Sequence, residues 1–161
     1  MRGAALCVGL LLGTAAVAQP PDDVVQWSAV LASSAPIAPG GSASITVTGT
    51  IANGWHVYAL EQLPGGPTPL RVSLADSALA TVDGAPSGSQ PQKVHDKAFG
   101  FDTQLYTHTL SVRLPLRMAS TAAAGSQELT VNVRFQSCTE HECRPPKTVH
   151  LAVPVDVSAH E

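Results

Sequence analysis

The sequence predicts an all-β fold, an antiparallel β-sandwich of the immunoglobulin-like type, from three observations. First, the 161 residues include 13 Gly and 13 Pro, so residues that favour turns recur along the chain. Second, short runs that alternate apolar and polar residues lie between these turns and are rich in Val, Ile and Thr, which is typical of half-buried strands. Third, no stretch has the apolar spacing of an amphipathic helix. About seven short strands at this spacing indicate two packed sheets.

The first expected strands lie in the N-terminal half of the chain. A short strand at residues 27–31 ends at the Pro-rich segment 35–41. Residues 42–51 alternate through β-branched side chains and form the clearest strand of the sequence. Asn53-Gly54 is a turn signal, so residues 55–60 are expected to form the partner strand of 42–51.

The remaining strands follow at similar spacing. They are expected at residues 70–74, 105–116, 129–136 and 148–157. Residues 83–92 carry no periodicity and are predicted to form an exposed loop. Pro115 lies inside one expected strand, and since proline has no N–H to donate, it is tolerated there only at an edge or a bulge.

The composition excludes two classes of protein. With 44% hydrophobic and 13% charged residues, the chain is too apolar and too weakly charged to be disordered. The 9 Lys and Arg against 12 Asp and Glu give a net charge of -3 and no general surface for nucleic acid. We therefore expect no nucleic-acid partner.

The first eighteen residues have the pattern of a secretory signal peptide. Arg2 supplies the positive charge, residues 4–12 form an apolar run, and an Ala-Val-Ala cleavage site precedes Gln19. The run is shorter than the roughly 17–25 apolar residues that span a bilayer. The sequence therefore predicts a signal peptide at 1–18 and a single exported, soluble domain at 19–161, without membrane insertion after cleavage.

Two cysteines, Cys138 and Cys143, belong to the exported domain, because Cys7 lies inside the signal peptide. Cys138 ends one expected strand and Cys143 precedes the next, with four residues between them. So tight a connection brings the two Cα atoms within the roughly 4.4–6.8 Å that a disulfide requires. Disulfides persist in exported proteins, so the pair is expected to be bonded.

The spacing leaves the role of this disulfide open. A bond that closes so short a loop removes little chain entropy, and a domain of this length does not need a local staple. A bond at an exposed loop is also accessible to an attacking thiolate. Nearby charges act in both directions: Glu140 and Glu142 raise the pKa of a thiol, whereas Arg144 and Lys147 lower it. A redox-active bond and a structural bond are equal alternatives on this evidence.

Two stretches carry a family resemblance. One is Asn-Gly-Trp-His-Val-Tyr at 53–58, followed by Gly-Gly-Pro-Thr-Pro-Leu at 65–70. The other is Val-Arg-Phe-Gln-Ser-Cys at 133–138, four residues, and Cys-Arg-Pro-Pro at 143–146. The second stretch matches a signature that consists of a strand, Gln-x-Cys, a short loop and Cys-x-Pro-Pro, in that order. Over about residues 27–157 the chain resembles the N-terminal periplasmic domain of the thiol:disulfide interchange protein DsbD.

The resemblance implies an immunoglobulin-like sandwich in the periplasm with the cysteine pair on a hairpin. It also implies a redox relay of the protein-disulfide reductase type that needs no cofactor. Cys143 would be the exchanging sulfur and Cys138 the resolving sulfur. The expected partners are thioredoxin-fold proteins and a membrane-embedded thiol reductase. Since the other domains of that family do not follow in this sequence, the electron donor is expected to be a separate protein.

The resemblance also implies a cap loop whose aromatic side chain shields the disulfide. Residues 96–101 fall in the matching region, where Phe99 or Phe101 can take this part, and Phe99 is the expected shield. Lys97 and Ala98 stand where the family has an acid and the usual aromatic. The loop between the cysteines is also shorter than in the best-known members.

His56 and Tyr58 are two residues apart on an expected strand, so they share one face. If this face looks toward the cysteine hairpin, both side chains line the site, as the resemblance supports. The alternative is an ordinary sheet surface. Trp55 points the other way and is expected in the core.

Two further functions remain open. The first is an exported interaction module in which the disulfide is only structural. The second is copper or zinc handling by Cys138, His141 and Cys143, although a closed zinc site needs a fourth ligand, which His150 on the next strand would have to supply. We expect no metal. No nucleophile elbow, phosphate loop or telling carboxylate pair indicates hydrolase or nucleotide chemistry.

Overall fold

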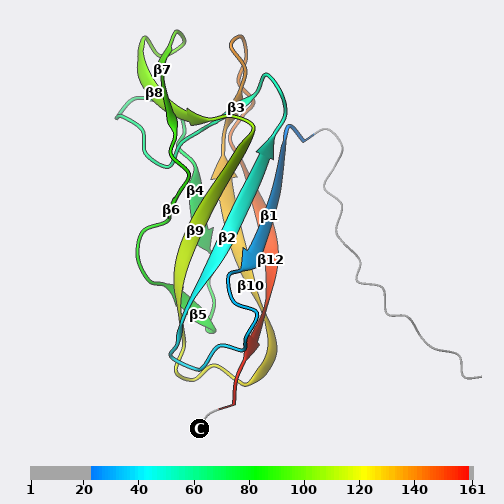
Figure 1. The fold of residues 1–161 in the computed structure, drawn as a ribbon. Coiled ribbons are helices and arrows are strands. Elements are labelled where there is room, and N and C mark those ends of the chain that lie inside the picture. The colour runs from blue at the N-terminus through cyan, green and yellow to red at the C-terminus, as the bar shows by residue number, and fades with distance from the viewer. Residues whose placement is uncertain (1–22, 160–161) are drawn as a thin grey trace, which may run out of the picture.

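Strands make up the regular structure of residues 23–159, the part of the chain that the computed structural model describes (Figure 1). No helix occurs in this range, which confirms the all-β prediction. In chain order the strands are β1 (Val25–Leu31), β2 (Ser42–Ile51), β3 (His56–Tyr58), β4 (Arg71–Leu74), β5 (Ala80–Val82), β6 (Ser87–Gly88), β7 (Gln92–Asp96), β8 (Phe101–Tyr106), β9 (Thr109–Met118), β10 (Gly125–Phe135), β11 (Ser137–Cys138) and β12 (Lys147–Val157). The expected signal peptide at 1–18 lies outside the described residues.

Two antiparallel sheets form the layers of the sandwich. One has the order β1-β2-β9-β5, with β6 also paired to β9, and the other has the order β12-β10-β4. Strict alternation in β9 turns every second side chain into the space between the layers. The buried side chains of this strand are Leu110, Val112, Leu114, Leu116 and Met118. They join buried residues of β10 and β12 in one hydrophobic core, as an immunoglobulin-like sandwich requires.

A third, smaller sheet extends the sandwich at one end. Its order is β11-β3-β8-β7, and it lies at the end opposite the C-terminal end of β12 (Figure 1). A second cluster of buried side chains belongs to this sheet and is separate from the main core. It consists of Tyr58, Leu105 and Cys138, with Val94 and Phe99 packed against it. The cysteine pair therefore lies on the small sheet rather than between the two layers.

The prediction that residues 55–60 pair with residues 42–51 is wrong. β2 pairs with β1 and β9, whereas β3 pairs with β11 and β8. The Asn53-Gly54 turn does exist, with Gly54 at a φ of 81° and the Trp55 N–H donating to the Ala52 carbonyl at 3.1 Å. This turn redirects the chain from one sheet into another instead of folding it back onto β2.

The prediction of a single strand at 105–116 is also wrong, because these residues belong to two strands, β8 and β9, that lie in different sheets. β8 ends at Tyr106 and β9 begins at Thr109. Between them His108 has a φ of 61°, which interrupts an extended chain. Its carbonyl accepts the Ile51 N–H at 2.6 Å, which fixes the break against the end of β2. The break could not be predicted, because Thr-His-Thr at 107–109 consists of residues that are common in strands and continues the alternating pattern.

The structure has more strands than the seven or so that the sequence predicts. β5, β6 and β7 were not expected, and the last two overlap the loop predicted at 83–92. These strands are short and mostly exposed, so they carry no apolar alternation. Pairing of their backbones with β8 and β9, rather than their own side chains, defines them.

Pro115 lies inside β9, which pairs with β2 on one side and with β5 and β6 on the other. β9 is therefore not an edge strand, contrary to the expectation. The Pro115 carbonyl accepts the Asp83 N–H at 2.9 Å, and its ring nitrogen faces the same side of the strand. On that side β5 pairs only with the stretch from Leu116 onward, and β6 only with Val112 and Arg113. The missing N–H therefore faces the gap between β5 and β6.

Candidate functional site

The two cysteines form a disulfide on the hairpin that follows β11, as predicted. Cys138 and Cys143 stand directly opposite each other as an antiparallel pair. The Thr139 N–H donates to the Glu142 carbonyl at 2.8 Å, and the Arg144 N–H donates to the Ser137 carbonyl at 2.9 Å. This is the pattern around a non-hydrogen-bonded pair, in which the strands approach most closely.

The close approach explains the Cα separation. It is 4.1 Å, slightly below the expected range of roughly 4.4–6.8 Å. The four-residue loop is closed by the side chain of Thr139, whose hydroxyl accepts the N–H groups of His141 and Glu142, each at 3.1 Å. Threonine hydroxyls commonly close turns in this way. The loop therefore holds its shape through its own hydrogen bonds.

The two sulfurs have different surroundings. Cys138 is fully buried, with 0% exposure, and packs with Tyr58 and Leu105. Cys143 is exposed at the far side of the hairpin. An external thiolate must approach a sulfur along the S–S axis, so Cys143 is the accessible target.

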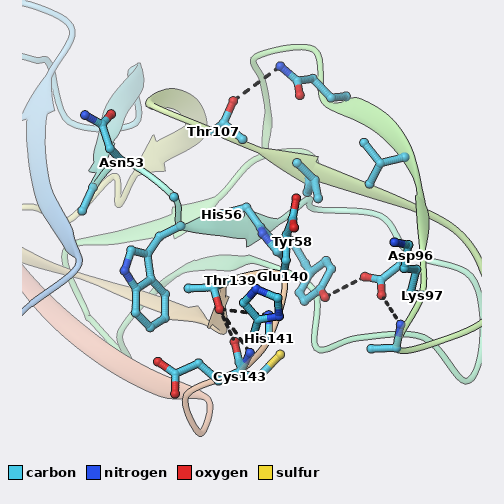
Figure 2. Close-up of a pocket in the computed structure, with 18 of the residues that line it drawn as sticks. Asn53, His56, Tyr58, Asp96, Lys97, Thr107, Thr139, Glu140, His141 and Cys143 are labelled. Atoms are coloured by element: carbon cyan, nitrogen blue, oxygen red, sulfur yellow. Dashed lines mark hydrogen bonds between the residues drawn. The ribbon is translucent and has the colours of Figure 1, made fainter.

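A pocket of about 680 Å³ opens beside Cys143 (Figure 2). Its walls come from the β2–β3 connection, from β3, from β7 with its following turn, from β8 and the β8–β9 connection, and from the cysteine hairpin. Among its lining residues are four of the six histidines of the chain, namely His56, His95, His108 and His141. The pocket gives a partner segment a place next to the exposed sulfur.

His56 and Tyr58 share one face of β3 and both line this pocket (Figure 2). Their rings meet edge to face with centroids 5.1 Å apart. Burial lowers the pKa of the His56 imidazole, and the negative charge of Asp96 opposes this in part. Burial also raises the pKa of the Tyr58 hydroxyl, as does its hydrogen bond to Asp96. Both groups are therefore uncharged near neutral pH.

Asp96 is a site residue to which the sequence interpretation gave no role. Its carboxylate accepts the Tyr58 hydroxyl at 2.8 Å and the Ala98 N–H at 2.9 Å, and it lies 3.5 Å from the Thr103 hydroxyl. An aspartate that accepts the N–H two residues ahead is a common way to begin a turn. That signal is in the sequence, but the bond to Tyr58 joins residues 38 positions apart and has no local signature.

The turn at 97–100 joins β7 to β8, and we call β7, this turn and β8 the cap hairpin. Gly100 has a φ of 74°, and its N–H donates to the Asp96 carbonyl at 2.8 Å. The Phe99 ring meets the Tyr58 ring edge to face at 6.1 Å and packs on the cluster that contains Cys138. Phe99 therefore contacts the cluster of the buried cysteine, whereas it is not among the residues that line the pocket beside Cys143.

Phe101 is the first residue of β8. Its ring is 6.1 Å from Phe99 and lies against Gly66, where an added Cβ would be 3.4 Å from it. Ala98, at the position where the resemblance leads to the expectation of an aromatic, lines the pocket itself. Of the two candidate aromatics, only Phe99 packs on the cluster of the buried cysteine.

The expected basic charges near Cys143 are partly engaged elsewhere. Lys147 forms an ion pair with Asp23 and lies 5.5 Å from the centre of the Phe135 ring. The Arg144 guanidinium stacks 4.7 Å above the ring of Trp55. Trp55, expected in the core, is instead partly buried at its border and lines the pocket.

His150 does not join the cysteine hairpin. Its ring nitrogen lies 2.6 Å from the Asn132 side chain, across the pair of β12 and β10. In residues 23–159 no group of three or more His, Cys, Asp or Glu side chains is arranged to hold a metal ion. The same residues contain no helix long and apolar enough to cross a membrane.

Comparisons with known proteins agree with this geometry. Residues 23–154 match the family model described as thiol:disulfide interchange protein DsbD, N-terminal. The crystal structure of the N-terminal periplasmic domain of ScsB from Proteus mirabilis is similar in fold, with a TM-score of 0.50 and 18% identity. The match covers 87% of this chain and 49% of the ScsB chain, so this chain spans about half the length of that relative.

A second solved structure, PapD-like domain 7 of human CEP192, gives a TM-score of 0.39 at 14% identity, and the match covers 98% of this chain and 100% of that one. The comparison with curated proteins gave no match.

Proposed function

This chain belongs to the family of the N-terminal domain of the thiol:disulfide interchange protein DsbD, and from that premise we propose that it relays electron pairs between thioredoxin-fold partners through Cys138 and Cys143. The observation that carries the proposal is the asymmetry of the disulfide. One sulfur is exposed beside a pocket, and the other is fully buried behind it. A bond that served only as a staple would need neither the pocket nor the difference in access.

The relay consists of two thiol–disulfide exchanges. In the first, a donor thiolate attacks the Cys143 sulfur, the bond to Cys138 breaks, and Cys138 leaves with the electron pair and takes up a proton. The second donor thiol then attacks the donor sulfur of this mixed disulfide and releases Cys143. The donor becomes a disulfide, and the domain is left with two thiols.

The second exchange passes the electrons on. The Cys143 thiolate attacks the disulfide of an oxidised acceptor and forms a mixed disulfide with one of its sulfurs. The Cys138 thiolate then attacks Cys143, which restores the Cys138–Cys143 bond and releases the acceptor in its reduced form. Each cycle moves one electron pair, and no cofactor takes part.

In the proposed relay the cap hairpin favours protein partners over small thiols. Phe99 packs on Tyr58 over the cluster of Cys138, so small thiols meet an aromatic cover on that side. A large partner has the pocket and the hairpin to bind. We also propose that residues 1–18 direct export and that residues 19–161 work in the periplasm, with a membrane-embedded thiol reductase as the donor.

Single-cysteine variants test the assigned order of attack. We expect Cys138→Ala, which retains the exposed sulfur, to form a stable mixed disulfide with a thioredoxin-fold protein whose single active-site cysteine is activated with thionitrobenzoate. Cys143→Ala retains only the buried sulfur and should form little of this complex. Non-reducing electrophoresis and intact mass spectrometry measure the yield of both complexes.

Equal trapping by both variants would remove the assigned order. If neither variant traps the partner while both lose several kcal/mol of stability, the disulfide is structural, and the chain is an exported interaction module instead. Thermal unfolding of both variants, followed by circular dichroism, supplies the second measurement.

A further inference from the structure

His56 lies next to the buried sulfur. The register of β11 and β3 places Cys138 directly opposite His56, and side chains of directly paired residues lie on the same face, with Cβ atoms about 4.5–5.5 Å apart. The His56 ring also contacts Tyr58, a member of the cluster that contains Cys138. The imidazole is therefore a close neighbour of the resolving cysteine.

The imidazole offers a nitrogen that the fold does not use. Nε2 of His56 is buried, and among the described residues it has no hydrogen-bond partner. Buried polar atoms are nearly always paired, so an unpaired one on the wall of a reactive site calls for an explanation. Burial lowers the pKa of this imidazole, so near neutral pH it is uncharged and able to accept a proton.

The chemistry at Cys138 needs such an acceptor. Cys138 has to lose its thiol proton before it attacks the mixed disulfide on Cys143, and full burial disfavours the free thiolate. The Tyr58 hydroxyl is not available for this purpose, because it donates to Asp96 at 2.8 Å. His56 is then the group placed to take the proton.

We propose that His56 accepts the thiol proton of Cys138 as Cys138 resolves the mixed disulfide, an inference that rests on the proposed relay. The proton moves from the Cys138 sulfur to Nε2, and the thiolate attacks the Cys143 sulfur. The Cys138–Cys143 bond forms, and the bond between Cys143 and the partner sulfur breaks. The partner leaves as a thiolate with the electron pair of that bond. When electrons flow the other way, the imidazolium returns the proton to Cys138.

Other ionisable groups line the same pocket and also affect the pH dependence of the exchange. Those that line it with His56 are Tyr58 on β3, His95, Asp96 and Lys97 on β7 and the following turn, His108 before β9, and Glu140, His141, Glu142 and Cys143 on the cysteine hairpin. Asp96 acts on His56 directly, because its negative charge favours the imidazolium. A test of His56 therefore needs a control at an exposed histidine outside the pocket, such as His150 on β12.

The aromatic disulfide DTNB separates resolution from the first attack. In reduced protein, Cys143 attacks DTNB and releases one thionitrobenzoate, and Cys138 then expels the second one from Cys143. Stopped-flow absorbance follows both phases. In His56→Gln we expect the second, intramolecular phase to be slower by on the order of 10²-fold near neutral pH, the typical effect of losing a general base. The first phase should keep its rate.

The pH profile distinguishes proton acceptance from a structural effect. In the unsubstituted protein the second phase should reach a plateau once the imidazole is uncharged. In His56→Gln it should instead keep rising about tenfold per pH unit, because the thiol must ionise unaided. His150→Gln, which changes an exposed histidine on β12 outside the pocket, should leave both phases as they are.

Each alternative outcome contradicts a different statement. An unchanged second phase in His56→Gln would overturn the role of His56 and leave the relay standing. Equal slowing of both phases would show that His56 only maintains the shape of the site. If the unsubstituted protein releases no second thionitrobenzoate, Cys138 does not resolve, and the proposed function fails together with this inference.

Discussion

The two sulfurs of one disulfide differ in exposure because of the strand pairing around them. Cys138 belongs to β11, so β3 and its side chains cover it. Cys143 lies across the hairpin and has only the isolated pair with Cys138. At the scale of single residues, the position relative to β3 therefore decides which sulfur an outside thiolate reaches.

The lowered pKa of His56 predicts a pH dependence of stability. Below its ordinary pKa of 6.5, the unfolded imidazole binds a proton that the folded one binds less readily. The free energy of unfolding should therefore fall as the pH drops below 6.5, and His56→Gln should show a smaller fall. Urea titrations at a series of pH values measure this.

The variant His150→Gln serves as the control, because His150 lies at the surface of β12, away from the pocket. A pH dependence that is the same in His56→Gln and in the unsubstituted protein would show that the folded state does not disfavour the charged imidazole at position 56.

Sequence reasoning at the residue scale succeeded where the signal was local. Alternation placed His56 and Tyr58 on one face, and the spacing of the cysteines predicted their bond. It failed for Asp96 and Lys147, whose partners Tyr58 and Asp23 are far away in the chain. A charge can be read from a sequence, but the group that it meets depends on the tertiary fold.

The cap hairpin is the element that covers the buried cysteine, and its turn depends on Asp96 and Gly100. One Asp96 carboxylate both begins this turn and accepts the Tyr58 hydroxyl from β3. The cap hairpin is therefore tied to the sheet by a hydrogen bond as well as by the Phe99 contact.

Phe99→Ala should expose the disulfide to small thiols. An edge-to-face aromatic contact contributes about 0.5–1.5 kcal/mol, so its loss should speed reduction by glutathione roughly two- to tenfold. Quenched time courses analysed by mass spectrometry give the rate. Phe101→Ala, which removes the neighbouring ring against Gly66, should have a smaller effect. Equal rates in Phe99→Ala and the unsubstituted protein would show that Phe99 is not the shield.

Long alternating strands were the predictable elements. Residues 42–51 were predicted with the observed bounds of β2, because ten residues of strict pattern leave little choice. The break at His108 and the short strands β5 to β7 were not predictable. Their positions depend on pairing with distant strands, and no apolar periodicity marks them.

Across the whole molecule, the core and the site are built from separate clusters. The main core lies between the two large sheets, whereas Cys138 belongs to the small cluster on the third sheet. The class of fold followed from turn density and alternation, but the third sheet did not, because the residues of β3 were expected to pair with β2 and those of β8 were expected to continue into β9. The side chains that pack the sandwich are therefore not the ones that surround the buried cysteine.

Reduction of the disulfide should leave the protein folded. The bond joins residues only five positions apart, so the chain-entropy model gives it about 2 kcal/mol. We expect the reduced protein to unfold in one cooperative urea transition with a lower midpoint than the oxidised protein. Tryptophan fluorescence measures both curves. Unfolding on reduction alone would show that the disulfide holds the sandwich together.

The closure of the cysteine hairpin by its own hydrogen bonds has a consequence for protein engineering. Thr139 and two backbone bonds fix the loop, while Glu140 and His141 stand on its pocket side without holding the register of β10 and β12. These two positions can be randomised in a library while the scaffold and both sulfurs are kept. Selection from such a library would yield domains that exchange with chosen partners, since loops on a rigid sandwich are where recognition is most easily rewritten.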